Sequence, residues 1–139
     1  MYCVTHITVG GFIAGRAGHP VFAFLGGMVS HIVLDAIPHH DYKRFISGLC
    51  DFALSLGIMT LFFWRPQLFP GRFFWGALGG ALPDVEIVFR CLLREPATYL
   101  FPSHTGLTPH RTWKRPGGFW VQVILIVAVV AVSYCLLDC

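Results

Sequence analysis

Seven histidines and seven carboxylates are the side chains of this sequence that could carry chemistry. Two of them, His31 and Asp35, are four residues apart, so on a helix they lie on one face, one turn apart. An imidazole nitrogen and a carboxylate oxygen at that spacing can ligate one zinc ion or bridge two metal ions. The alternative is a hydrogen bond between the two that satisfies a pair of buried polar groups.

Asp84, which follows Leu82 and Pro83, is the next candidate. Proline removes a backbone donor and frees a carbonyl, which is tolerated at membrane depth only where protein or a watery cavity receives it. The position of Asp84 therefore indicates a ligand that projects into a cavity, or else a helix cap. Glu86 points roughly the opposite way around a helix and is the weaker candidate.

His104 and His110 lie in the segment 101–111, which also contains two prolines and a glycine. That composition predicts a shaped turn rather than a helix, on which two histidines could converge on one ion. The alternative is a solvated loop with incidental histidines. Three cations follow them: Arg111, Lys114 and Arg115. We expect these to form a basic patch on anionic lipid, although one of them could instead hold a substrate phosphate.

The elements that must position these residues are strongly apolar. Apolar residues make up 55% of the 139-residue chain and charged residues only 12%, about half the charged fraction of an ordinary soluble domain. The segment 118–137 holds twenty residues with no charge, about the length that crosses a hydrocarbon core of roughly 30 Å. The sequence therefore predicts an integral membrane protein.

Four further apolar stretches precede that segment, at 4–14, 21–37, 49–64 and 73–93. Pro20 is placed to begin the second stretch. The prediction is an all-α fold: a single helical membrane domain over 1–139, built as a bundle of four or five helices. We expect the first helix to be short and the fourth to be broken at Pro83.

If all five stretches cross, the N-terminus and the loops 38–48 and 94–117 lie on one side. That side carries more cations than the other: Lys43, Arg44, Arg94, Arg111, Lys114 and Arg115, against Arg16, Arg65 and Arg72. The positive-inside rule makes it cytoplasmic. The same topology brings to that side His6, His31, Asp35, His39, His40, Asp41, Asp84, His104 and His110, and leaves only His19 on the other.

The five cysteines are scattered and odd in number, without a C-x-x-C pair. They argue against a disulfide framework and against a thiolate zinc site. The net charge of +3 gives no nucleic-acid signature, so no nucleic-acid partner is expected.

Three motifs resemble those of the inner-membrane metal-dependent hydrolase family, the LexA-regulated membrane-bound hydrolases. They are His6 with the glycines after it, the Leu-Pro-Asp motif at Leu82-Pro83-Asp84, and the segment from His104 to His110. The last departs from the family pattern at Thr105 and Pro109. The family is more distantly similar to the zinc-dependent phospholipase C and P1-type nuclease group, so the resemblance implies a helical metal site in the inner membrane.

The leading hypothesis is a hydrolase with a metal site at the cytoplasmic interface, acting on an ester or phosphoester, with a lipid as one candidate substrate. One or two divalent ions, expected to be zinc, would be bound by His6, His31, Asp35, Asp84, His104 and His110. Asp35 and Asp84 are the expected catalytic carboxylates, bridging the metals or serving as general base. The alternative is a non-catalytic membrane protein that binds or senses a metal ion or proton. Five short helices would enclose such a site incompletely, which leaves room for a homodimer.

Overall fold

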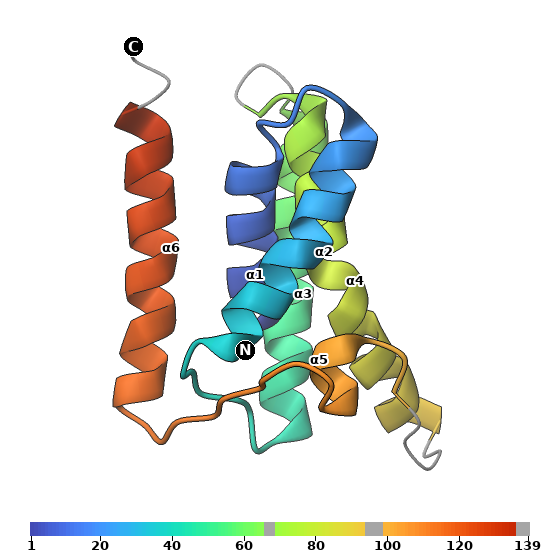
Figure 1. The fold of residues 1–139 in the computed structure, drawn as a ribbon, viewed down its shortest axis with the longest axis vertical. Helices are drawn as coiled ribbons and strands as arrows, with labels where there is room; N and C mark the ends of the chain where they lie inside the picture. Colours follow the sequence, from blue (N-terminus) through green and yellow to red (C-terminus); the bar gives the residue numbers. More distant parts are fainter. Residues whose placement is uncertain (66–68, 94–98, 136–139) are drawn as a thin grey trace.

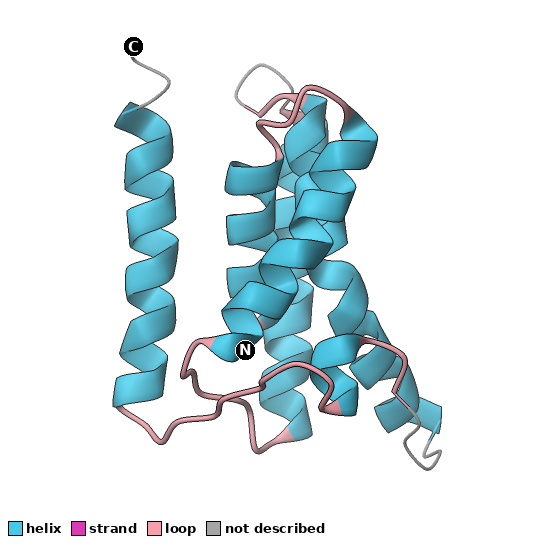
Figure 2. Ribbon diagram, viewed as in Figure 1, coloured by secondary structure: helices cyan, strands magenta, loops and turns pink. Residues whose placement is uncertain are grey.

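The computed structural model describes residues 1–65, 69–93 and 99–135. Within them the chain is helical and no residue is assigned to a β-strand (Figures 1 and 2). The elements in order are α1 (Cys3–Val9), the π-helical turn η1 (Gly10–Ala14), α2 (Pro20–Ala36), α3 (Phe45–Trp64), α4 (Gly71–Leu93), α5 (Pro102–Thr105) and α6 (Gly117–Cys135). The predicted all-α fold is confirmed. Arg94, one of the loop cations counted above, lies outside the described residues, and so do Leu136 and Leu137 at the end of the predicted segment 118–137.

Glycines bring α1, η1 and α2 against α4, backbone to backbone. A Cβ atom on Gly76 would meet the carbonyl oxygen of Gly10, and one on Gly27 would meet that of Gly76. A Cβ on Gly80 would likewise meet the carbonyl oxygen of His6. Small residues at helix crossings are typical of membrane bundles, where close backbone approach replaces the hydrophobic driving force. The crossings hold His6 of α1 and His31 of α2 beside the same turn of α4.

The predicted break at Pro83 is wrong, because α4 runs without interruption from Gly71 to Leu93 with Pro83 inside it. Pro83 has no N–H to offer the carbonyl of Gly79, four residues earlier. The neighbouring carbonyl oxygen of Gly80 lies 2.8 Å from Nδ1 of His31 of α2. The proline is thus accommodated inside α4, along which α2 packs closely.

The ends of the other helices follow local signals. Pro20 begins α2 as predicted, and the His19 side chain accepts a hydrogen bond from the Val21 N–H at 3.2 Å. The segment 101–111 is not only a turn, since Pro102–Thr105 forms the short helix α5. That helix ends at Gly106, whose φ of 80° is left-handed and suits a residue without a side chain.

Helix α6 stands beside the rest of the bundle and is attached by polar contacts near both ends (Figure 1). Near its start, Gln122 accepts a hydrogen bond from the Tyr2 N–H at 2.7 Å and donates one to the His40 carbonyl at 2.9 Å. Near its end, Ser133 accepts a hydrogen bond from Arg16 at 2.9 Å. Gln122 and Ser133 are each 1% exposed, so these contacts are shielded from the surroundings.

One helix of the described part, α3, is long and apolar enough to cross a membrane. The apolar run of α6, Gly117–Ser133, is shorter than that, and so are those of α1 with η1 and of α2. The described structure therefore offers one span by length and composition.

Candidate metal centre

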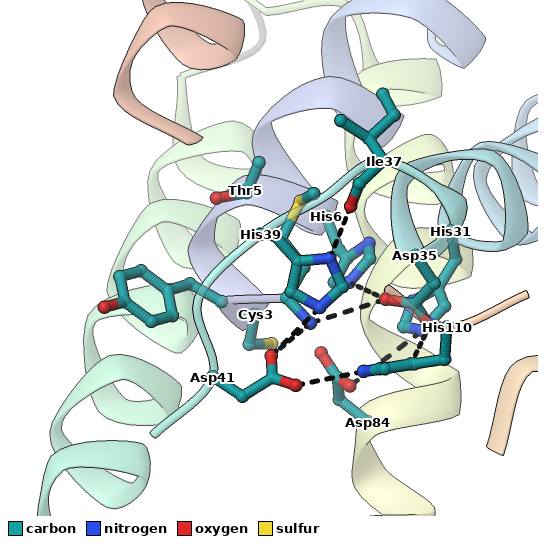
Figure 3. Close-up of polar contacts among 12 residues, drawn as sticks. Cys3, Thr5, His6, His31, Asp35, Ile37, His39, Asp41, Asp84 and His110 are labelled. Carbon is teal, nitrogen blue, oxygen red and sulfur yellow. Dashed lines mark hydrogen bonds and ion pairs between the residues drawn. The ribbon is translucent and has the colours of Figure 1, made fainter. Parts of the chain in front are cut away.

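All six residues predicted as ligands lie at one end of the bundle, where the loops and the N-terminal end of α1 meet (Figures 1 and 3). Two further residues join them, and we call the whole set the His/Asp cluster: His6, His31, Asp35, His39, Asp41, Asp84, His104 and His110. Its members come from α1, α2, α4, α5 and two loops. The convergence that topology predicted for this end is present in the fold.

Asp35 is the centre of the cluster and is 0% exposed. Its Oδ1 lies 3.3 Å from Nε2 of His6, and its Oδ2 lies 3.2 Å from Nε2 of His31. The same Oδ2 lies 3.4 Å from Nδ1 of His110 and 4.0 Å from Nε2 of His104. A carboxylate approached by imidazoles on both oxygens is the geometry from which a bridging ligand can act.

His6 and His31 lie face to face, with ring centroids 3.6 Å apart. Because Nδ1 of His31 lies at hydrogen-bonding distance from the Gly80 carbonyl, its Nε2 is directed toward Asp35 and Asp84. A backbone carbonyl that holds one imidazole nitrogen fixes the tautomer and leaves the other nitrogen to ligate. Nε2 of His31 lies 3.9 Å from Oδ1 of Asp84, so the α4 carboxylate closes this part of the cluster.

The two loops of the cluster are tied together through their backbones. The Arg111 N–H donates to the Asp35 carbonyl and the His39 N–H to the Arg111 carbonyl, each at 3.0 Å, and the Trp113 N–H donates to the His39 carbonyl. As a result Asp41 receives two histidines, with Nε2 of His39 and Nε2 of His110 each 3.0 Å from its carboxylate (Figure 3). His39 itself is oriented by the Ile37 carbonyl, 2.7 Å from its Nδ1.

Glu86 holds the turn that carries His104 rather than joining the cluster. Its carboxylate accepts hydrogen bonds from the backbone N–H groups of Leu100 and Phe101, just before α5. It also lies 3.7 Å from Nδ1 of His104. This placement agrees with the expectation that Glu86 is the weaker ligand candidate, and gives it a positioning role.

The loop members of the cluster have shifted pKa values. Hydrogen bonds with Asp35 and Asp41 raise the pKa of His110 to about 9. Burial raises the pKa of Asp41, but hydrogen bonds from His110 and His39 outweigh it and hold that pKa well below its usual range. Burial and the neighbouring His31 lower the pKa of His104. His110 is therefore protonated at neutral pH in the metal-free protein, and a cation that binds it displaces a proton.

Many polar atoms of the cluster are buried without a hydrogen-bond partner among the described residues. They include both ring nitrogens of His6 and of His104, Nε2 of His31 and of His39, and one carboxylate oxygen each of Asp35 and Asp84. We call such an atom unpaired when it makes no hydrogen bond, even where it lies at ion-pair distance from a carboxylate, as Nε2 of His31 does 3.2 Å from Asp35. A native protein rarely keeps several such atoms together without a function for them.

Three sets of ligand atoms lie within 4.8 Å of one another: His6, His31 and Asp84; His31, Asp35 and His104; and Asp35, His39 and His110. His31 is shared by the first two sets and Asp35 by the last two. Mixed imidazole and carboxylate ligands suit zinc and other first-row divalent metals. The residues present thus fit one divalent ion, or two bridged by Asp35.

Sequence reasoning left His39 and Asp41 open and did not single out Asp51. Asp51 of α3 is 7% exposed and accepts a hydrogen bond from the Cys3 N–H at 2.6 Å, so it caps α1 across the bundle. A cap that comes from another helix leaves no local signal. His40 is turned toward the Trp113 carbonyl, 3.2 Å from its Nδ1, and His19 lies exposed at the far end.

Comparisons with protein-family models, with curated proteins and with solved structures find no match for this chain.

Proposed function

We propose that this chain is a multi-pass inner-membrane protein that hydrolyses a phosphoester or ester with a divalent metal, zinc, bound in its His/Asp cluster. The observation that carries the proposal is the set of unpaired buried nitrogen and oxygen atoms that face one another across four helices and two loops. Those atoms are the donors that a divalent ion takes. The resemblance of the motifs around His6, Asp84 and His104 to the membrane-bound hydrolase family is consistent with it.

The distribution of apolar side chains supports the membrane part of the proposal. Large apolar residues are exposed along the helices, including Phe22 at 66%, Phe63 at 63%, Leu92 at 63% and Ile124 at 63%. Charged and polar residues such as His31 and Asp35 are instead the buried ones. A surface of apolar side chains around buried polar ones is the arrangement expected of helices surrounded by lipid. The cation count of the loops supports a cytoplasmic position for the cluster and the N-terminus.

The chemistry assigned to the site divides among its residues. A divalent ion held there would activate a water for attack and polarise the ester oxygen. His31, Asp35 and His104, whose ligand atoms lie within 4.8 Å of one another, would hold it. Asp84, which faces the cluster from α4, is placed to accept the proton of the attacking water as general base. In phosphoester hydrolysis the water oxygen bonds to phosphorus, the P–O ester bond breaks, and the departing alkoxide takes up a proton.

The test is hydrolysis of p-nitrophenyl phosphate and bis-p-nitrophenyl phosphate by zinc-loaded protein in detergent. We expect turnover that a chelator abolishes, and a loss of about 100-fold or more in Asp84→Asn, the usual contribution of a general base. The control is His19→Asn, which changes an exposed histidine at the far end of the bundle and keeps the helix cap. A protein that binds zinc but cleaves no ester or phosphoester would contradict catalysis and support the non-catalytic alternative.

A further inference from the structure

Two cavities of different character meet beside the cluster. One, of about 840 Å³, is bordered by basic residues of the 41–44 and 112–115 segments. The other, of about 540 Å³, lies between α3 and α4 and has mainly apolar walls. Residues 41–44 line both, so the two cavities are neighbours on either side of this segment. Each has the size of a small-molecule site, for which about 300–1,000 Å³ is typical.

The cavity between α3 and α4 reaches the cluster at one end. Asp41, Asp84 and His110 line it there, and all three belong to the His/Asp cluster (Figure 3). Away from the cluster its walls are mainly apolar and partly exposed, formed by Leu49 and Phe52 of α3 and by Ile87, Val88 and Cys91 of α4, with Asp51 as the carboxylate among them. A groove with such walls, open at the surface of helices that face lipid, suits a hydrocarbon chain.

The lining of the basic cavity indicates that the other end of the ligand is negatively charged. Lys43, Arg44, Lys114 and Arg115 line it, with Asp41 as its one carboxylate among the lining residues described. That carboxylate is already engaged by His39 and His110, which leaves the cations without a counter-charge inside the cavity. Cations grouped in this way bind phosphate groups by charge-assisted hydrogen bonds.

We propose that the ligand of these two cavities is a lipid phosphate: a single-chain or longer apolar tail that ends in one or more phosphate groups. The tail lies between α3 and α4, and the phosphate end lies toward Lys43 and Arg44. The phosphoester bond then falls between the two cavities, beside Asp41 and Asp84. This assignment names the substrate class and rests on the proposed function for its catalytic part only, because binding in the groove requires no metal.

Two cysteines provide built-in reporters of groove occupancy. Cys91 is exposed and lines the groove, whereas Cys50 is exposed on α3 and is not among its lining residues. Metal-stripped protein in a steroid-based detergent is treated with a maleimide, and labelling at each cysteine is followed by peptide mass spectrometry. Dodecyl phosphate is the probe. Dodecyl maltoside supplies the same chain without the anion, and inorganic phosphate supplies the anion without the chain.

We expect dodecyl phosphate to slow labelling of Cys91 several-fold at concentrations where the other two compounds do not, and to leave Cys50 unchanged. The double substitution Lys43→Gln/Arg44→Gln is expected to raise the half-protecting concentration about tenfold, the effect of losing a charge-assisted contact. Val88→Trp, which fills the groove, is expected to abolish protection.

Equal protection of both cysteines, equal protection by dodecyl maltoside, or no protection of Cys91 would overturn the proposal. The outcome is separable from that of the proposed function. A zinc-loaded protein that hydrolyses phosphoesters without Cys91 protection would refute only the lipid groove. Protection in a protein that binds no metal would refute only the hydrolase.

Discussion

The two ends of this bundle are chemically opposite. At one end Phe12, Phe62, Phe69 and Phe73 pack together, with ring centroids of Phe62 and Phe69 4.8 Å apart. At the other end α1 and α4 each contribute one member of the His/Asp cluster, and α2, α5 and two loops contribute the rest. The aromatic end buries side chains that need no partner. The cluster end buries side chains that do, at a cost that the rest of the fold must offset.

The glycine contacts between the two ends explain how they coexist. Gly10, Gly27, Gly76 and Gly80 hold three helices together through their backbones. The side chains on either side are thus free to differ without changing the helix crossings. We therefore expect stability to be concentrated in the aromatic end and in these crossings, whereas the cluster, under the proposed function, serves binding.

The largest expected effect is a loss of stability from a substitution in the aromatic end. Phe62 is 2% exposed, so Phe62→Ala should lower the free energy of unfolding by about 3–5 kcal/mol, the usual cost of truncating a buried phenylalanine. Unfolding in mixed detergent measures it. The zinc content of the folded fraction should be unchanged. A parallel loss of zinc would show that the two ends are not separable.

A smaller effect is expected on the zinc affinity of the cluster end. Glu86→Ala removes the acceptor for the Leu100 and Phe101 N–H groups and releases the turn that carries His104. We expect zinc affinity to fall about 10–100-fold, as for other outer-shell partners of metal ligands. Isothermal titration with zinc measures the change. The zinc affinity of Glu86→Gln, which keeps one carbonyl oxygen, should lie between that of the wild type and that of Glu86→Ala. Unchanged affinity in the alanine variant would contradict a positioning role.

The smallest effect concerns the start of α1. Asp51→Ala removes the cap on the Cys3 N–H and should cost about 1 kcal/mol of stability. Asp51→Asn should cost less, because asparagine also caps helices well. Thermal unfolding distinguishes the two variants. If both were equally destabilised, the carboxylate charge rather than the capping hydrogen bond would be responsible.

The longer helices α2, α3, α4 and α6 could be predicted from the sequence because each is a long apolar run between prolines, glycines and charges. The convergence of His6, His31, Asp35 and Asp84 could be predicted as well, since alternate helices return to the same side. Both predictions depend only on local pattern and on the alternation of direction along the chain.

Long-range contacts could not be predicted in this way. Pro83 predicted a break, yet α4 is continuous through it, packed closely against α2. Asp51 caps a helix 48 positions away, and Gln122 bonds to Tyr2, 120 positions away. Neither leaves a local signature, because a polar residue in an apolar helix looks the same whichever partner it has.

The most direct test of the central claim is the metal content of protein purified in detergent without chelator, measured by elemental mass spectrometry. The account predicts about one or two equivalents of zinc or another divalent metal in the wild type. The metal should be lost in His31→Ala and in Asp35→Ala, and retained in His19→Asn, which changes an exposed histidine at the far end and keeps the helix cap. A folded wild type with no metal above background would contradict the account and leave the cluster as a buried polar network without a bound ion.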